Sequence, residues 1–318
     1  MNNWNNENRE PRLVGAEGSP QPGRDSERSA ELLRDVYHSH TPARQATDPI
    51  GVFDSGAGGL TILTALRAEM PHENFLYMGD TAHCPYGVRS DEEITALTLD
   101  ACHFLLARGV KLIIIACNTA SQAALSTLRA TIPAIPFVGV VPAVKPAARL
   151  TKKGRIGIAA TNQAAKAIYL RQLIDEFAEG IEAFAVGCPD LVTLVERGQL
   201  DGPEVEETVR QALQPVLAEN IDVLVLGCTH FPALQTVIER VAGPGVQVID
   251  SSRAIARRTR TVLQNAELLA PTTLQDSGGG QLEIWSSGDP DAFSSVATHI
   301  LGLPVRARQT THEIEGVS

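Results

Sequence analysis

The chain has 318 residues, of which 43% are hydrophobic and only 4% aromatic, and its formal net charge is -10. The length predicts about two domains with aliphatic cores. The acidic charge excludes nucleic acid as a main partner, because affinity for a phosphate backbone comes from basic patches. No apolar run long enough to cross a membrane and no cleavable leader are recognisable, so we expect a cytoplasmic protein without a membrane partner.

An odd number of cysteines in a long chain without a secretion signal favours free thiols over a disulfide framework. Two of the five end a run of aliphatic residues and precede a small polar cluster, namely Cys117 and Cys228. The other three are interpreted as ordinary small side chains. They are Cys84, Cys102 and Cys188.

The first 48 residues are polar and lack a sustained apolar period. This composition predicts a disordered extension over residues 1–48, and a short helix over 27–39 is a further prediction within it. Globular sequence begins with a short apolar strand that runs into a Gly-rich turn, over residues 49–60.

Strands and amphipathic helices then alternate. The helix expected over 90–109 has a capping box of Ser90 and Glu93 and a stop at Gly109. Short, wholly apolar strands between such helices are typical of parallel sheets that are covered on both faces. These strands are expected at residues 75–80, 110–116 and 137–141.

The second half of the globular region repeats the first. Residues 155–166 again form a strand, a hydroxyl residue and the start of a helix, with Thr161 in the place of Ser55. The segments around Cys117 and Cys228 align at a similar offset. We interpret the repeat as a duplicated α/β unit whose two sets of strand ends face one another.

The tail is expected to pack on the first half. Its sequence predicts a basic helix over 252–264, a polar loop over 271–281, a strand over 282–289 and a last helix over 291–302. The loop is the expected site of disorder.

The strand ends carry the candidate chemistry, because ligands of open parallel sheets bind beyond the carboxyl ends of the strands. Each of the two cysteines there precedes a predicted helix, whose amides should lower the thiol pKa. One such thiol would suggest a nucleophile. Two thiols from facing halves predict a different reaction, in which one thiol removes a proton from one face of a carbon and the other thiol delivers a proton to the opposite face. Such a reaction is a racemisation. Titratable neighbours able to assist are Asp54, Glu196 and His230.

Five segments resemble the signature segments of glutamate racemase, in order and spacing. They are VFDSGAGGLT (52–61), GDTAHCPYG (79–87), ACNTAS (116–121), VERG (195–198) and LGCTHFPAL (226–234). The resemblance runs from about residue 49 to the end of the chain.

The resemblance implies an α/β fold of two pseudo-symmetric flavodoxin-like domains with parallel sheets and the active site at their interface. The first domain would comprise 49–144 plus 254–318, and the second 145–253. The implied activity is interconversion of L- and D-glutamate without pyridoxal phosphate, metal or nucleotide, supplying D-glutamate for peptidoglycan. Glutamate is then the small-molecule partner, and a homodimer is left open.

The resemblance also implies roles for individual residues. Cys117 would act on the D-isomer and Cys228 on the L-isomer, assisted by Asp54, Glu196 and His230. The implied substrate contacts are Asp54, Ser55, Tyr86, Gly87, Asn118, Thr119, Thr229 and His230. The chain departs from the family pattern at His83 and Cys84, where an Arg or other residue and an apolar residue are common, and this places an extra thiol near the site.

Other readings remain open from the residues alone. The Gly-rich turn could bind a dinucleotide with Asp80 as ribose acceptor, although Thr61 stands where the last glycine of that fingerprint belongs. Cys228, His230 and His83 could hold zinc, but their spacing lacks the pairs of a structural site. The chain could also be a racemase or decarboxylase for another small acid, such as aspartate or a substituted malonate, or a regulatory module that kept the fold.

Overall fold

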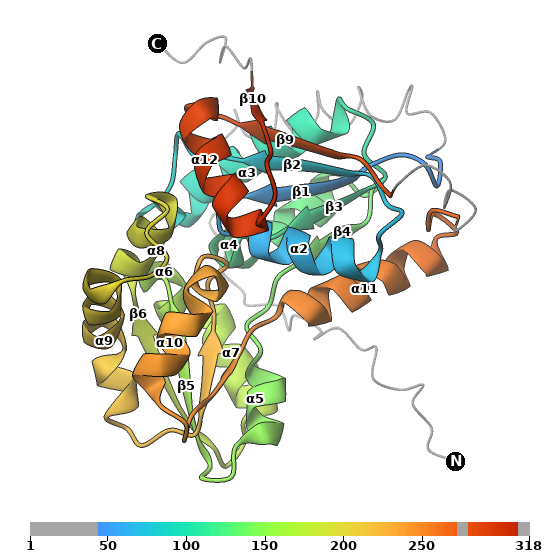
Figure 1. The fold of residues 1–318 in the computed structure, drawn as a ribbon. Helices are drawn as coiled ribbons and strands as arrows, with labels where there is room; N and C mark the ends of the chain where they lie inside the picture. The colour runs from blue at the N-terminus through green and yellow to red at the C-terminus, as the bar shows by residue number, and fades with distance from the viewer. Residues whose placement is uncertain (1–43, 272–278, 311–318) are drawn as a thin grey trace. The chain divides into compact units, whose positions relative to one another are not determined.

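Two parallel β-sheets organise the chain in the computed structural model, which describes residues 44–271 and 279–310. The first sheet has the strand order β10-β9-β2-β1-β3-β4 and the second β6-β5-β7-β8. All the paired strands run parallel. Figure 1 shows helices against the faces of each sheet. The helix expected over 27–39 and most of the loop expected at 271–281 lie outside the described residues.

The first sheet combines the beginning of the globular chain with its tail. Its strands are β1 (Ile50–Asp54), β2 (Phe75–Gly79), β3 (Leu112–Ile115), β4 (Phe137–Gly139), β9 (Leu282–Ser286) and β10 (Ala307–Gln309). Its helices are α2 (Leu60–Glu69), α3 (Asp91–Leu106), α4 (Asn118–Thr131), α11 (Ser252–Asn265) and α12 (Pro290–Leu301), with the 3₁₀ turn η1 (Tyr86–Val88). The expected return of the tail to the first half is confirmed by the pairing of β9 with β2.

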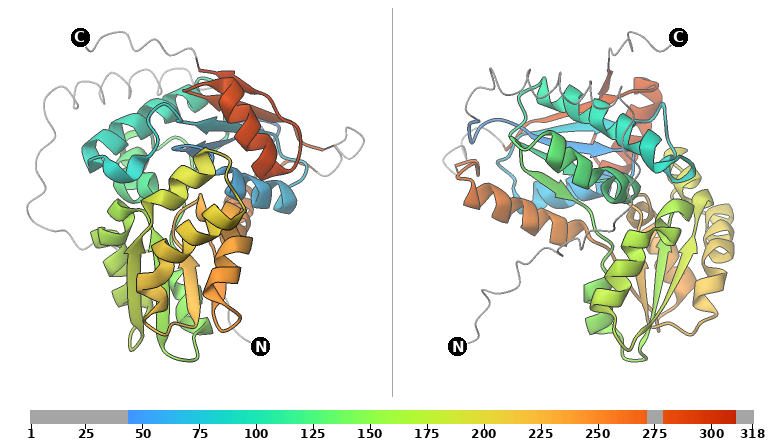
Figure 2. Two further views of the ribbon diagram at one scale, coloured as in Figure 1. Left: turned by 60° about the vertical axis from the view of Figure 1, so that its left-hand side comes forward. Right: turned by 180° about the vertical axis from the view of Figure 1, so that it is seen from behind.

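The second sheet is built from the middle of the chain. Its strands are β5 (Arg155–Ala160), β6 (Glu182–Gly187), β7 (Val223–Leu226) and β8 (Gln247–Ile249). The helical elements are α5 (Val144–Leu150), α6 (Asn162–Lys166), α7 (Ile168–Phe177), α8 (Pro189–Glu196), α9 (Pro203–Leu217), η2 (Phe231–Leu234) and α10 (Gln235–Ala242). The second view of Figure 2 shows these elements from behind. The domain limits at residues 144 and 253 stay a prediction.

Alternation of side chains along the central strands divides each sheet's packing into two cores. In β1, Ile50 and Val52 pack with α2, α11 and α12, whereas Phe53 packs on the other face with α3 and α4. In β5, Ile158 joins α5 and α7, whereas Ala159 joins α8, α9 and α10. The aliphatic composition is therefore explained by strands that are buried on both faces, as expected from the sequence.

The helix expected over 90–109 is confirmed as α3, with one difference at its start. The Ser90 side chain accepts a hydrogen bond from the Glu93 amide at 3.2 Å, as a capping residue does. The carboxylate of Glu93 does not complete the capping box, because it pairs with Arg89 one turn away. Gly109 follows the helix with φ of +71°, a conformation that favours glycine.

No helix of the described ranges combines the length and apolar character needed to cross a bilayer.

A buried ion pair joins the segments before β2 and β3, the two strands on either side of β1 in the first sheet. The Lys111 ammonium lies 2.5 Å from the Glu73 carboxylate, and both side chains are almost fully buried. The same ammonium donates to the Ala46 carbonyl, and Glu73 accepts from the Ala270 amide at 2.8 Å. The pair therefore fastens the segments before β1 and after α11 to the sheet.

Replacing Lys111 with Met should lower the free energy of unfolding by about 3 to 5 kcal/mol, because it leaves the Glu73 carboxylate buried without its counter-charge. Urea denaturation measures this. Exposed Lys152 provides the matched control, since Lys152→Met should stay within about 0.5 kcal/mol of the unchanged protein. An equal, small effect of both changes would contradict a structural role for the pair.

Candidate active site

The two candidate thiols occupy equivalent positions in the two sheets. In the first sheet β1 lies between β2 and β3, and in the second sheet β5 lies between β6 and β7. The chain therefore leaves the central strand toward one edge of the sheet and later returns to its other side. Such a switch point is where open α/β sheets bind ligands. Cys117 follows β3 and Cys228 follows β7, the two strands at these switch points. The topology thus supports the duplication that was inferred from the sequence.

Both thiols line one cavity, so they are not buried in separate compartments. Its volume is about 10 Å³, room for roughly one water molecule. The lining residues are Ser55, Pro85, Tyr86, Gly87, Cys117, Asn118, Thr119, Thr161, Val192, Cys228, Thr229 and His230. All the candidate site residues except Asp54 and Glu196 are among them, and these two are hydrogen bonded to the lining.

Cys117 is the residue before the first turn of α4. Its sulfur accepts hydrogen bonds from the Ser55 hydroxyl at 3.4 Å and from the Ala120 amide at 3.5 Å. Burial, followed by the nearby charge of Asp54, nevertheless raises the pKa of the Cys117 thiol to about 12. The expectation that the helix start would lower this pKa is wrong, because loss of hydration outweighs two hydrogen bonds to sulfur.

Cys228 has a different environment, although it occupies the equivalent position. The 3₁₀ turn η2 follows it instead of the expected helix start. Its sulfur lies 3.6 Å from Nδ1 of His230, whose Nε2 lies 2.5 Å from Oε1 of Glu196. The second thiol is therefore served by an imidazole and a carboxylate rather than by helix amides.

The histidine and the carboxylate of this pair favour their charged forms. Burial works to lower the pKa of His230, but its hydrogen bonds to Cys228, Cys84 and Glu196 outweigh burial and raise that pKa well above the usual value. Burial likewise works to raise the pKa of Glu196, but the hydrogen bond and charge of His230 and the Ala57 amide hold it below its usual value. An imidazolium that donates to both neighbours fits this geometry.

Two carboxylates join the glycine turn of the first sheet to the second half. Glu196 accepts a hydrogen bond from the Ala57 amide at 2.7 Å. Asp54 accepts from the Gly56 amide at 2.9 Å and from the Thr229 hydroxyl at 3.0 Å. Burial raises the pKa of Asp54, against the opposing charge of His230. Both carboxylates thus hold residues that line the cavity.

The glycine turn is filled by side chains of this chain, which disfavours the dinucleotide reading. A Cβ at Gly56 would lie 2.1 Å from Glu196 Oε1, and one at Gly58 would lie 2.6 Å from Nδ1 of His230. These glycines allow close approach of the two halves, and a pyrophosphate would need the same space.

Asn118 and Thr119 bring polar groups to the cavity from the first turn of α4. The Asn118 side chain is buried, and its Nδ2 has no hydrogen-bond partner among the described residues. The Thr119 hydroxyl lies 3.1 Å from that of Thr161 across the two halves. A buried donor without a partner is costly, so Nδ2 is suited to receive an acceptor of a ligand.

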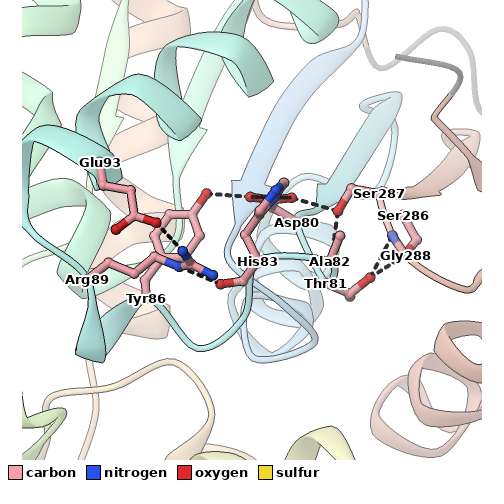
Figure 3. A network of polar contacts seen from close by, with 10 residues as sticks. All are labelled: Asp80, Thr81, Ala82, His83, Tyr86, Arg89, Glu93, Ser286, Ser287 and Gly288. Atoms are coloured by element: carbon pink, nitrogen blue, oxygen red, sulfur yellow. Dashed lines mark hydrogen bonds and ion pairs between the residues drawn. The ribbon is translucent and has the colours of Figure 1, made fainter. Parts of the chain in front are cut away.

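Tyr86 and Gly87 reach the cavity from a loop that Asp80 holds in place. Figure 3 shows the Asp80 carboxylate between Tyr86, His83 and Ser287. The Tyr86 hydroxyl donates to Oδ2 at 2.6 Å, the Ser287 hydroxyl donates to Oδ1 at 2.6 Å, and Nδ1 of His83 lies 2.8 Å from Oδ1. Asp80 therefore positions the loop and joins it to the tail that follows β9.

Sequence reasoning missed several residues of this site. Asp80 was considered only as a ribose acceptor, and Pro85 and Val192 were not proposed as binding residues, although both line the cavity. Thr161 was placed at a strand end where a site would form, but it was given no binding role. The place of Thr161 directly after β5, equivalent to that of Ser55 after β1, was the signal available for it. Val192 lies inside an amphipathic helix and gave no signal.

Two parallel α/β sheets each place a thiol from a switch point in the lining of one shared cavity. Residues 60–259 match the family Asp/Glu/Hydantoin racemase. The chain belongs to this family.

Individual relatives agree with that assignment. A glutamate racemase from Roseiflexus sp. (strain RS-1) is 42% identical over 260 residues, which cover 82% of this chain and 94% of the relative. One from Herpetosiphon aurantiacus is 44% identical over 248 residues, covering 78% and 96%. The match therefore spans nearly the full length of these relatives.

Solved structures give the same result for the fold. The crystal structure of glutamate racemase isoform RacE1 from Bacillus anthracis has a TM-score of 0.74 and 34% identity, covering 83% of this chain and 97% of that one. Escherichia coli glutamate racemase in complex with L-glutamate and the activator UDP-MurNAc-ala has a TM-score of 0.72 and 31% identity, covering 82% and 97%. The expected racemase fold is confirmed.

The raised pKa of Cys117 can be tested by thiolate absorbance. At about pH 10 an ordinary thiol with a pKa of about 8.5 is almost fully ionised, whereas Cys117 should remain a thiol. The ultraviolet difference between the unchanged protein and Cys117→Ser should therefore show no thiolate contribution at that pH. A full thiolate signal from Cys117 there would contradict the effect of burial.

Asp80→Asn should raise the KM for substrate by about tenfold or more, because loss of a hydrogen bond to a charged group costs about 1.5 to 3 kcal/mol. An amide can accept from Tyr86 or Ser287 with only one oxygen. The value of kcat should change less, since Tyr86 does not carry the proton. Asp100→Asn, the same change at a neighbouring acid on α3, serves as the control, and equal KM values for both variants would count against a positioning role for Asp80.

Proposed function

We propose that this chain interconverts L- and D-glutamate by proton transfer between two thiols, without pyridoxal phosphate, metal or nucleotide. The observation that carries the proposal is the presence of Cys117 and Cys228 in the lining of one cavity. The names of the relatives supply glutamate as the substrate.

The proposed reaction needs one sulfur as base and the other as acid. With L-glutamate, Cys228 would take the proton from the α carbon, and the electron pair would remain on that carbon. Cys117 would then give its thiol proton to the opposite face, which yields the D-isomer. In the reverse direction the roles exchange.

The environments of the two sulfurs support this assignment. The raised pKa of Cys117 keeps its proton in place, as an acid requires. The His230 imidazolium faces the sulfur of Cys228 at 3.6 Å and would stabilise a thiolate there.

Polar groups of the cavity would bind the amino acid. Asn118 Nδ2 is a donor suited to a carboxylate, and the hydroxyls of Ser55, Thr119 and Thr229 add to it. Asp54 does not line the cavity, and its carboxylate accepts hydrogen bonds from the Gly56 amide and the Thr229 hydroxyl. We assign it the positioning of Thr229. The cavity must widen to admit glutamate, since its volume of about 10 Å³ suits one water molecule.

The proposal extends to the use of the product and to assembly. D-Glutamate would serve peptidoglycan synthesis, which growth of a D-glutamate auxotroph carrying this gene tests. A homodimer is a separate hypothesis, and sedimentation of the purified protein decides it.

Changing either thiol to a hydroxyl should abolish turnover in both directions, because each direction uses both sulfurs. Cys117→Ser and Cys228→Ser should each lower kcat by about 10² to 10⁴-fold, the range for loss of a general acid or base. Circular dichroism of either enantiomer of glutamate, without added pyridoxal phosphate, measures the rate.

Cys188→Ser is the matched control, because the Cys188 sulfur lies near the carbonyls of Val186 and Ala212, which can accept from a serine hydroxyl. A regulatory module that kept the fold would show no turnover in any variant. Racemisation of aspartate in place of glutamate would retain the proton transfer and replace the substrate, whereas loss of carbon dioxide from a substituted malonate would replace both.

A further inference from the structure

Three side chains with good metal-binding atoms meet beside the proposed active site. The Cys84 sulfur, a carboxylate oxygen of Glu196 and a ring nitrogen of His230 all lie within 4.8 Å of one another. They come from three places in the chain: the loop before η1, the last residue of α8 and the residue before η2. The set differs from the zinc ligands considered from the sequence, because His83 binds Asp80 instead.

Cys84 carries no proton in the proposed racemisation, although its hydrogen bond helps to raise the pKa of His230. It does not line the cavity that holds the two reacting thiols. A Cβ built on Gly56 would lie 3.1 Å from the Cys84 sulfur and 2.1 Å from Glu196 Oε1, so both atoms lie over the same point of the glycine turn. The Cys84 thiol therefore adds a sulfur ligand beside His230 and Glu196.

The cluster is shielded yet reachable. The His230 side chain is 3% exposed and that of Glu196 is 22% exposed, and Cys84 is of intermediate burial. Shielding strengthens the attraction of a cation to a carboxylate, and partial exposure leaves a path for an ion and one water molecule. Such a set, with an open fourth position, is typical of tetrahedral zinc.

We propose that Cys84, Glu196 and His230 form a Zn²⁺ site that inhibits the enzyme when it is occupied. One thiolate, one imidazole and one carboxylate favour Zn²⁺ over Mg²⁺ or Ca²⁺, which prefer oxygen ligands throughout. Zinc bonds of about 2.0 to 2.3 Å place donors roughly 3.3 to 3.8 Å apart in a tetrahedron. The donors lie within 4.8 Å of one another, and the Nε2 of His230 and Oε1 of Glu196, now 2.5 Å apart, must separate by about 1 Å to admit the ion.

Binding is a proton exchange. Zn²⁺ takes the thiolate of Cys84 and Nε2 of His230, and the protons of the thiol and of Nε2 leave to solvent. The ion also takes the Glu196 oxygen that accepts from His230 and from the Ala57 amide. Zinc binding therefore breaks both the hydrogen bond from the Ala57 amide to Glu196 and the ion pair of Glu196 with His230. The inhibitory effect rests on the proposed function, whereas the binding of metal does not.

The first test measures binding without any activity. Untagged, fully reduced protein is titrated with Co²⁺, whose thiolate-to-metal absorption reports a Co–S bond, and then with Zn²⁺ in competition. We expect one ion per chain, a dissociation constant at least tenfold weaker in Cys84→Ser, and no change in the matched control Cys188→Ser. Cys84→Ala supplies a second variant should the first fail to fold. Unchanged binding in both Cys84 variants would overturn the site.

The second test measures racemisation at increasing Zn²⁺. Because Cys84 is hydrogen bonded to His230, the zinc response of each variant is measured relative to its own rate without zinc. The zinc concentration for half inhibition should rise at least tenfold in Cys84→Ser. A chelator should restore the rate of the unchanged enzyme. Equal inhibition of all variants would place zinc on the two reacting thiols, and binding without inhibition would overturn the regulatory effect. Absence of racemisation with intact Co²⁺ binding would refute the proposed function and leave the metal site standing.

Discussion

One carboxylate, that of Glu196, connects the two halves of the site. It receives the Ala57 amide from the glycine turn of the first sheet and the imidazole that faces Cys228 in the second. The turn must approach that carboxylate closely, and glycine at position 56 makes this approach sterically possible. The geometry of the second thiol and the closure of the cavity therefore depend on the same partly buried carboxylate.

Duplication has produced two sulfurs in equivalent topological places with unequal surroundings. Cys117 receives hydrogen bonds from a hydroxyl and a helix amide, whereas Cys228 faces an imidazole supported by a carboxylate. Burial dominates at the first sulfur and raises its pKa. The proposed reaction uses one sulfur as base and the other as acid, and the two sulfurs face different groups that can support these two roles.

The support of the site reaches well beyond the residues that line it. Asp80 ties the Tyr86 loop to the segment after β9, so the tail contributes to a site that it does not line. Cys84 enters the same region from the loop and meets Glu196 and His230. The residues that serve proton transfer are thus also available to a soft metal ion, which gives metal availability a physical route to control of the reaction.

The sequence by itself determined the parallel α/β class, the duplication and the pair of thiols. Buried strands such as Leu112–Ile115 are wholly apolar, and residues at fixed positions after such strands must gather at one edge of a sheet. Only the tertiary structure decided the charge preferences and the partners across the halves. The pKa of Cys117 depends on lost hydration and on Asp54, and the partners of Glu196 lie far away in sequence. Local pattern carries periodicity and turn chemistry, whereas burial and long-range approach exist only once the chain has folded.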